Sequence, residues 1–483
     1  MWPGTVDGVP AGIATSDPRA TAAGAALLAE GATAVDAAVA AALVLYVVEP
    51  QSCGLGGDAF LIHVAPGSDP VARDGSGALP RALDDAALAA AGLDTIPARG
   101  GAAATVPGAI RLLEDALAEF GSRSLAEVAQ AAIALAGDGF EVRPTLATAA
   151  ARAVGEIGDD PVLGPLYVPG GQPVATGDVV VNRVLADCLS TICSEGAHIL
   201  YDGDLARAVV ARLQAAGGYL DVEDFAEHTT LGVEPVRTTF RGSTVWELPP
   251  PTQGIAVIHA LDAIGAGLPA VDTAEDWRFV METMAAALTR AGFDLSQIGP
   301  RPSPAKGDTT YIGVIDQEGR GASLITSVFG DFGAHLGIPE LGSPIGNRAT
   351  MLRALRLPMR PGQKPPHTTI PAAVTRDGKL QMVLGVAGGF MQPQAQVQVL
   401  IHMLERGAAP QAAIDEPRFR IGFGGVLSLE AGHPLCESMP EAASRPPGPE
   451  GFGAAQVVAI DPDGNVSAGA DPRRGGVAQV LAS

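Results

Sequence analysis

Apolar residues with helical spacing dominate the first 300 residues of the chain. Ser16-Asp17-Pro18 is typical of a helix start, and the Ala-rich helix predicted to follow it ends at Gly31. A second apolar helix is predicted over 34–48, where Glu49-Pro50 stops it. The same spacing predicts helices over 110–119, 124–137, 205–216 and 255–265, and strand-like runs occupy 59–64 and 231–248.

Strand-like patterns dominate after residue 309. Runs of apolar and β-branched residues predict strands over 310–316, 322–329, 370–375, 380–385 and 455–460. Helices are predicted near 393–406 and 410–415. Because strands and helices occur in both halves without strict alternation, the pattern favours a layered α+β fold.

The segment around 309–330 combines two strand-like runs with a polar turn that contains Gly319. This pattern predicts a hairpin, and a turn centred on Glu318 places Thr309 opposite Ser327, within one residue. Two facing hydroxyls are typical of ordinary cross-strand pairs. They also suit a nucleophile, because a neighbouring hydroxyl can orient and activate it. Spacing alone leaves both interpretations open.

Charge and composition exclude several classes of partner. With 31 basic and 53 acidic residues the chain carries a formal charge of −22, which disfavours nucleic acid and anionic membrane surfaces. The longest apolar run, over 37–48, has 12 residues, and a membrane-spanning helix needs about 20. The N-terminus has no signal-peptide pattern, so we expect a cytoplasmic protein. Cys188 and Cys193 lack metal-site spacing, and no metal or cofactor is predicted.

Eight short motifs follow one another in order along the chain. They are Gly-Ala-Thr-Ala-Val-Asp-Ala-Ala-Val at 31–39, Glu-Pro-Gln-Ser and Gly-Leu-Gly-Gly at 49–57, Val-Pro-Gly at 106–108, Pro-Pro-Pro-Thr-Gln-Gly at 249–254, Gly-Val-Ala-Gly-Gly at 385–389, Glu-Pro-Arg-Phe at 416–419 and Ala-Asp-Pro-Arg at 470–473. Through them the chain resembles the gamma-glutamyltransferase family of N-terminal-nucleophile hydrolases over essentially its whole length.

This resemblance implies a four-layer αββα sandwich and a precursor that cuts itself before Thr309. Residues 1–308 and 309–483 would then form a large and a small chain, intertwined in one domain. The resemblance assigns the base to the freed α-amine of Thr309, the nucleophile to its hydroxyl and the helper hydroxyl to Ser327. It assigns the oxyanion hole to the backbone N–H groups of Gly388 and Gly389. Thr310 is adjacent, and the residues that follow favour Thr309 as the first residue.

Three positions depart from the pattern that recognises a gamma-glutamyl group. Ser76 occupies the place of the carboxylate-binding Arg, Met351 is near that of the acidic residue, and His367-Thr368 replaces a Ser pair. Because the charged partners of the substrate are lost, glutathione is not the expected substrate.

The replacements resemble a subgroup of acylases and amide hydrolases that act on other acyl groups. In this subgroup Arg348, next to Asn347, is the candidate for holding a substrate carboxylate, with a structural ion pair as the alternative. His367 and Thr368 either orient Arg348, the nucleophile or the substrate, or are structural. We therefore expect an amidohydrolase or acyltransferase for a small amide.

Two further interpretations remain open at the level of the sequence. The same nucleophile could cleave a C–C bond in a secondary-metabolite pathway, or an unprocessed homologue could bind a small molecule without catalysis. The segment between the helix at 281–288 and Thr309 is only about 20 residues long, shorter than is usual in the family. This shortening either opens the active site or makes self-cleavage inefficient.

Overall fold

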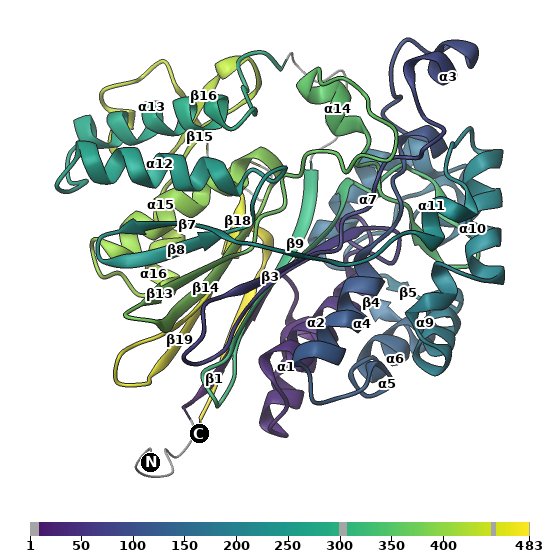
Figure 1. The fold of residues 1–483 in the computed structure, drawn as a ribbon, viewed down its shortest axis with the longest axis horizontal. Helices are drawn as coiled ribbons and strands as arrows, with labels where there is room; N and C mark the ends of the chain where they lie inside the picture. The colour runs from purple at the N-terminus through teal and green to yellow at the C-terminus, as the bar shows by residue number, and fades with distance from the viewer. Residues whose placement is uncertain (1–8, 299–306, 446–450, 483) are drawn as a thin grey trace.

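Two β-sheets lie face to face, and helices cover the outer face of each sheet (Figure 1). The computed structural model describes residues 9–298, 307–445 and 451–482. None of the helices in these ranges is long and apolar enough to cross a membrane. The layers confirm the four-layer α+β sandwich expected from the sequence.

Within the described residues, the first sheet has seven strands. Their order is β20 (Val477–Leu481), β1 (Ala11–Thr15), β9 (Gly307–Ile315), β10 (Gly321–Gly330), β2 (Asp58–Val64), β3 (Val71–Asp74) and β6 (Leu231–Val233). The second sheet has six described strands, in the order β19 (Val466–Ala470), β18 (Ala454–Ile460), β14 (Lys379–Ala387), β13 (Ala372–Arg376), β8 (Ser243–Glu247) and β7 (Val236–Phe240).

Apart from α3 (Asp85–Ala90) and α14 (Thr350–Leu355), which share a small separate core, the described helices form two groups of unequal size. The larger group packs on the first sheet or extends from it and comprises α1 (Pro18–Ala29), α2 (Ala34–Val48), α4 (Ala109–Phe120), α5 (Leu125–Val128), α6 (Gln130–Asp138), α7 (Pro144–Ile157), α8 (Leu163–Tyr167), α9 (Arg183–Glu195), α10 (Asp204–Ala215) and α11 (Val222–Ala226). The smaller group lies on the second sheet and comprises α12 (Gly254–Gly267), α13 (Ala274–Arg290), α15 (Gln392–Leu404) and α16 (Pro410–Asp415).

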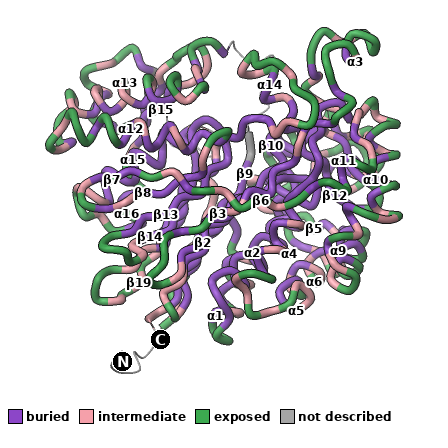
Figure 2. The backbone as a smooth tube through the Cα atoms, viewed as in Figure 1, coloured by how far each residue is buried: buried purple, intermediate pink, exposed green. Residues whose placement is uncertain are grey.

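Separate apolar cores fill the three spaces between the layers. Burial is concentrated on the central strands and α2, whereas the outer helices expose one face (Figure 2). Between the sheets, Phe60 and Tyr311 from the first sheet meet Trp246 and Val383 from the second. Alternate residues of β9 point to opposite cores, since Ile312 packs among the helices and Tyr311 between the sheets.

The hairpin predicted from the turn at Gly319 is formed by β9 and β10. Thr310 pairs with Thr326, and the register then shifts, so that Phe329 faces Asp308. Helix α2 packs along this hairpin with all of its residues buried. Its first backbone N–H groups are capped by Thr33 and by Asp316 at the hairpin turn. The hairpin and α2 therefore form one buried unit.

Most predicted elements are present with shifted ends, whereas several others were not predicted, among them the helices α7 and α9 and the strands β1, β3, β19 and β20. The strand β1 has the sequence Ala-Gly-Ile-Ala-Thr, whose small residues give little β signal, yet it pairs with both β9 and β20. The helix predicted at 281–288 is α13, and residues 299–306 of the shortened segment before Thr309 lie outside the described residues.

We predict opposite stability effects for two Gly→Ala substitutions. A Cβ at Gly385 in β14 would lie 2.1 Å from a ring carbon of the buried Tyr311, so Gly385→Ala should destabilise the protein by about 1–3 kcal/mol. Gly155 is exposed in α7, and a Cβ added there would meet no atom within 4 Å, so Gly155→Ala should stabilise by about 0.5–1 kcal/mol. Urea unfolding midpoints measure both, and a Gly385→Ala variant as stable as the parent would contradict this packing.

Candidate active site

Three neighbouring strands of the first sheet end at one edge of the space between the sheets. Thr309 on β9, Ser327 on β10 and Asp58 on β2 are all buried there, and Ser327 is paired directly with Asp58. They continue the alternation that places Tyr311, Ile325 and Phe60 between the sheets. The three polar side chains therefore follow an apolar core on the same face.

The two hydroxyls of the hairpin meet at a bulge. The Thr309 hydroxyl donates to Ser327 Oγ over 3.2 Å, and Ser327 Oγ also accepts from the Phe329 N–H at 2.9 Å. Phe329 has a φ of 75°, which is rare for a bulky residue and is held here by the register shift. The pairing expected from the sequence is thus observed, and the bulge fixes the orientation of Ser327.

The faces of β9 distinguish Thr309 from Thr310. Thr310 is fully buried, and its even-numbered neighbours Ile312 and Val314 point into the core beneath α2. Thr309 points with Tyr311 toward the second sheet. Only Thr309 of this pair shares a face with the predicted oxyanion residues.

The predicted oxyanion residues follow β14 of the second sheet. Gly388 has a φ of 139° and Gly389 a φ of 58°, and the turn η4 (Gly389–Met391) lies against β9. Only glycine adopts both conformations without strain. Neither backbone N–H donates a hydrogen bond to another described residue. Both remain available to a ligand, as an oxyanion hole requires.

Arg348 is fully buried and is paired with Asp58. Its Nε lies 3.2 Å from Asp58 Oδ2, and its guanidinium carbon lies 4.5 Å from the centre of the Phe329 ring. Burial raises the pKa of Asp58 and lowers that of Arg348, and the charge of each partner opposes the shift of the other. Arg348 Nη2 has no hydrogen-bond partner among the described residues. The ion pair that the sequence left as an alternative is therefore present, with one donor unused.

His367 and Thr368 lie beside this ion pair. Arg348 Nη1 donates to Thr368 Oγ1 at 3.5 Å, and His367 Nδ1 is 4.0 Å from Asp58 Oδ2. The His367 ring meets Phe60 edge-on, with 4.9 Å between centroids. Burial and the charge of Arg348 hold the pKa of His367 well below its usual range, so the ring is neutral. Its Nε2 has no partner in the described parts of the chain.

Two of the predicted residues, Asn347 and Ser76, make hydrogen bonds that hold neighbouring segments of the chain. The Asn347 amide donates to the carbonyl of Ala98 and accepts from the Gly330 N–H, just beyond the bulge. Ser76 donates to Asp74 Oδ1 at 2.6 Å, and the next N–H, of Gly77, donates to Asp58 Oδ1. Both residues border the ion pair without offering it a free polar group.

A second polar network holds the backbone of Thr309 from its other side. Strand β1 pairs with β9 only as far as Gly313, and beyond it Arg474 Nη1 donates to the Thr309 carbonyl at 3.3 Å. Near Arg474 lies the buried Glu49, which accepts from the Ser16 hydroxyl at 2.9 Å. Burial, with the like charge of Asp17, raises the pKa of Glu49 to about 7.

Sequence reasoning missed Asp58, Glu49 and Arg474 as members of the site. Each stands within or next to a motif, namely Gly-Leu-Gly-Gly, Glu-Pro-Gln-Ser and Ala-Asp-Pro-Arg. A charged residue beside a glycine-rich or proline-containing motif was the available signal, but its partner lies hundreds of positions away in the chain.

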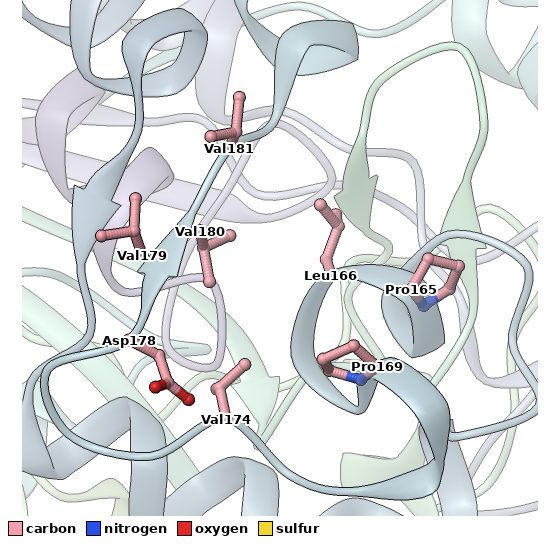
Figure 3. Close-up of a pocket in the computed structure, with 8 residues that line it drawn as sticks. All are labelled: Pro165, Leu166, Pro169, Val174, Asp178, Val179, Val180 and Val181. Atoms are coloured by element: carbon pink, nitrogen blue, oxygen red, sulfur yellow. The ribbon is translucent and has the colours of Figure 1, made fainter.

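A depression elsewhere on the surface is separate from these residues. It has a volume of about 350 Å³ and is lined by residues of α8, of η2 (Pro169–Gly171) and of 174–181 (Figure 3). None of the predicted site residues lines it.

We predict that Glu49 makes the stability of the protein depend on pH. Its pKa is about 7 in the folded state and about 4.5 when unfolded, so its contribution is fully present below pH 4.5 and is lost as pH rises toward 7. The free energy of unfolding of Glu49→Gln minus that of the parent should therefore rise by about 3 kcal/mol between pH 4.5 and pH 8. Urea titrations across this range measure it, with the exposed Glu340→Gln as control. A constant difference between variant and parent would contradict the assignment.

Comparison with known proteins places this geometry in a family. The family model for gamma-glutamyltranspeptidase matches residues 20–298 and 294–481. The glutathione hydrolase-like YwrD proenzyme of Bacillus subtilis (strain 168) is 29% identical, over 95% of this chain and 96% of its own length. The oxamate amidohydrolase proenzyme of Klebsiella pneumoniae subsp. pneumoniae is 30% identical, over 94% of this chain and 95% of its own.

Solved structures agree with the sequence comparisons. The cephalosporin acylase from Bacillus halodurans superposes with a TM-score of 0.88 at 30% identity, covering 100% of this chain and 97% of its own. The protein is thus a member of the gamma-glutamyltranspeptidase family of N-terminal-nucleophile hydrolases, and an amide hydrolase or acyltransferase.

Proposed function

We propose that the chain cleaves itself before Thr309 and that Thr309 then hydrolyses a small amide whose acyl group carries a carboxylate. The observation that carries this proposal is the hydrogen bond from Thr309 to Ser327, opposite a glycine turn with two unused N–H groups. The proenzyme names of the two relatives support the self-cleavage.

The contacts of Thr309 suggest how each step proceeds. In self-cleavage the Thr309 hydroxyl attacks the carbonyl of residue 308, and water hydrolyses the resulting ester, which frees the α-amine of Thr309. In turnover this amine takes the hydroxyl proton as the oxygen attacks the substrate amide. The N–H groups of Gly388 and Gly389 stabilise the oxyanion, and the amine returns the proton to the departing nitrogen. Water then releases the acid from the Thr309 ester.

The charged groups beside Thr309 support an acyl group with its own carboxylate. Arg348 Nη2 is a buried donor without a partner among the described residues, and an unsatisfied buried donor is unfavourable unless a ligand pairs with it. The Arg348 cation is already balanced by Asp58, so the substrate receives a directional hydrogen bond rather than a full opposite charge. At the positions that depart from the family pattern, the charged partners for both ends of a gamma-glutamyl group are replaced, which argues against glutathione.

Hydrolysis of p-nitroanilides tests the role of Thr309. We expect the parent to release nitroaniline from the succinyl or glutaryl derivative, and Thr309→Ala to release none, because it lacks both nucleophile and base. Ser327→Ala should retain the chain cut but lower kcat by at least about 10-fold, since the nucleophile loses its orienting acceptor. Undiminished turnover by Thr309→Ala would exclude this residue as the nucleophile.

The role of Arg348 is tested by substrate preference. The parent should favour the succinyl over the butyryl p-nitroanilide by about 10- to 100-fold in kcat/KM, the worth of one charge-assisted hydrogen bond. The double variant Arg348→Met with Asp58→Asn removes both charges together and leaves no unpaired buried ion. It should lose this preference while its kcat for the butyryl compound stays similar. A preference that survives in the double variant would disprove carboxylate binding by Arg348.

A further inference from the structure

Gln253 joins the two parts of the site that the second sheet contributes. Its buried Nε2 donates to the carbonyl of Thr368 at 2.6 Å and to the carbonyl of Gly389 at 2.8 Å. Both hydrogens of one amide are therefore used on backbone oxygens that are 21 residues apart in the chain. One side chain thus connects the substrate-holding segment to the glycine turn.

The backbone around Gln253 strengthens this connection. The Gln253 N–H donates to the His367 carbonyl at 3.0 Å, and the His367 N–H donates to the Pro251 carbonyl at 3.1 Å. These bonds fix 251–253 beside 367–368 as a short parallel bridge. The amide of Gln253 then reaches from this bridge to Gly389, whose neighbour Gly388 has its carbonyl bound by the Met391 N–H.

Glutamine is an unfavourable residue type at position 253. It is the N-cap of α12, a position where Ser, Thr, Asn and Asp are favoured, and its side chain makes no capping bond. Its Oε1 is buried without a hydrogen-bond partner among the described residues, which is unfavourable. A residue that breaks two local rules in a site is expected to serve the site rather than the helix.

We propose that Gln253 is a positioning residue that locks the oxyanion turn at a fixed distance from the segment 367–369. The inference rests on the proposed function of Gly388 and Gly389. Both glycines have positive φ values and wide conformational freedom, so the orientation of the turn depends on the bonds that hold its peptide groups. The Gly389 N–H shares its peptide plane with the Gly388 carbonyl, which the Met391 N–H binds, and the next plane carries the Gly389 carbonyl, which Gln253 binds. Without the amide of Gln253 the Gly389 carbonyl keeps only the bond from the Gln392 N–H, so the turn is no longer tied to the segment 367–369. A small misplacement of an oxyanion donor then lowers the rate strongly.

The test compares Gln253→Met with a matched control, Gln398→Met. Gln398 in α15 is equally buried, and its Nε2 also donates to two carbonyls, those of Gln394 and Phe419, away from the glycine turn. On processed protein with glutaryl p-nitroanilide, Gln253→Met should lower kcat by about 10- to 100-fold with KM changed less than about threefold. Gln398→Met should lower the urea midpoint and keep kcat within about twofold of the parent.

A second variant keeps the proposal testable if Gln253→Met does not fold. In Gln253→Glu an ionised carboxylate repels both carbonyls, whereas its protonated form donates to one of them. Its kcat relative to the parent should therefore rise as pH falls.

Three results would overturn the proposal: an unchanged kcat in Gln253→Met, an equal loss in Gln398→Met, or a pH-independent ratio for Gln253→Glu. A parent without Thr309-dependent turnover would overturn the proposed function, and with it the need for an oxyanion turn. Because that result is seen in the parent itself, the two failures are distinguishable.

Discussion

The hydrogen bond from Thr309 to Ser327 lies at a one-residue shift in the register of the central hairpin. The pairing of Thr310 with Thr326 places Thr309 opposite Ser327, and beyond this point the shift pairs Asp308 with Phe329. The same shift gives Phe329 its positive φ and places its ring against Arg348. One local irregularity thus lies between the proposed nucleophile and the charged group expected to hold the substrate.

The two sheets contribute different parts of the candidate site. The first sheet supplies Thr309, Ser327 and Asp58 from adjacent strands, and the second supplies the segments before β13 and after β14. The proposed active site lies where the apolar core between the sheets ends, so buried polar groups there lie in a low dielectric and act strongly on one another. Gln253 belongs to neither sheet, and it joins the two segments of the second.

The sequence predicted what is local and missed what depends on contacts between distant segments. The hairpin pairing followed from the turn at Gly319, and the αββα fold and its glycine turn followed from the family resemblance. The ion pair of Asp58 with Arg348 joins residues 290 positions apart, and no pattern along the chain marks such a pair. The strand β1 was missed because small residues pack in the centre of a sheet without a strand-like signal.

The central claim is that Thr309 becomes an N-terminal residue, and the mass of the purified protein tests it most directly. The unbroken chain has a mass of 48.8 kDa. We predict two chains of roughly 31 and 18 kDa, in proportion to 308 and 175 residues, with the smaller one beginning at Thr309. A single chain of 48.8 kDa that hydrolyses amides, or a new N-terminus at another residue, would contradict this claim.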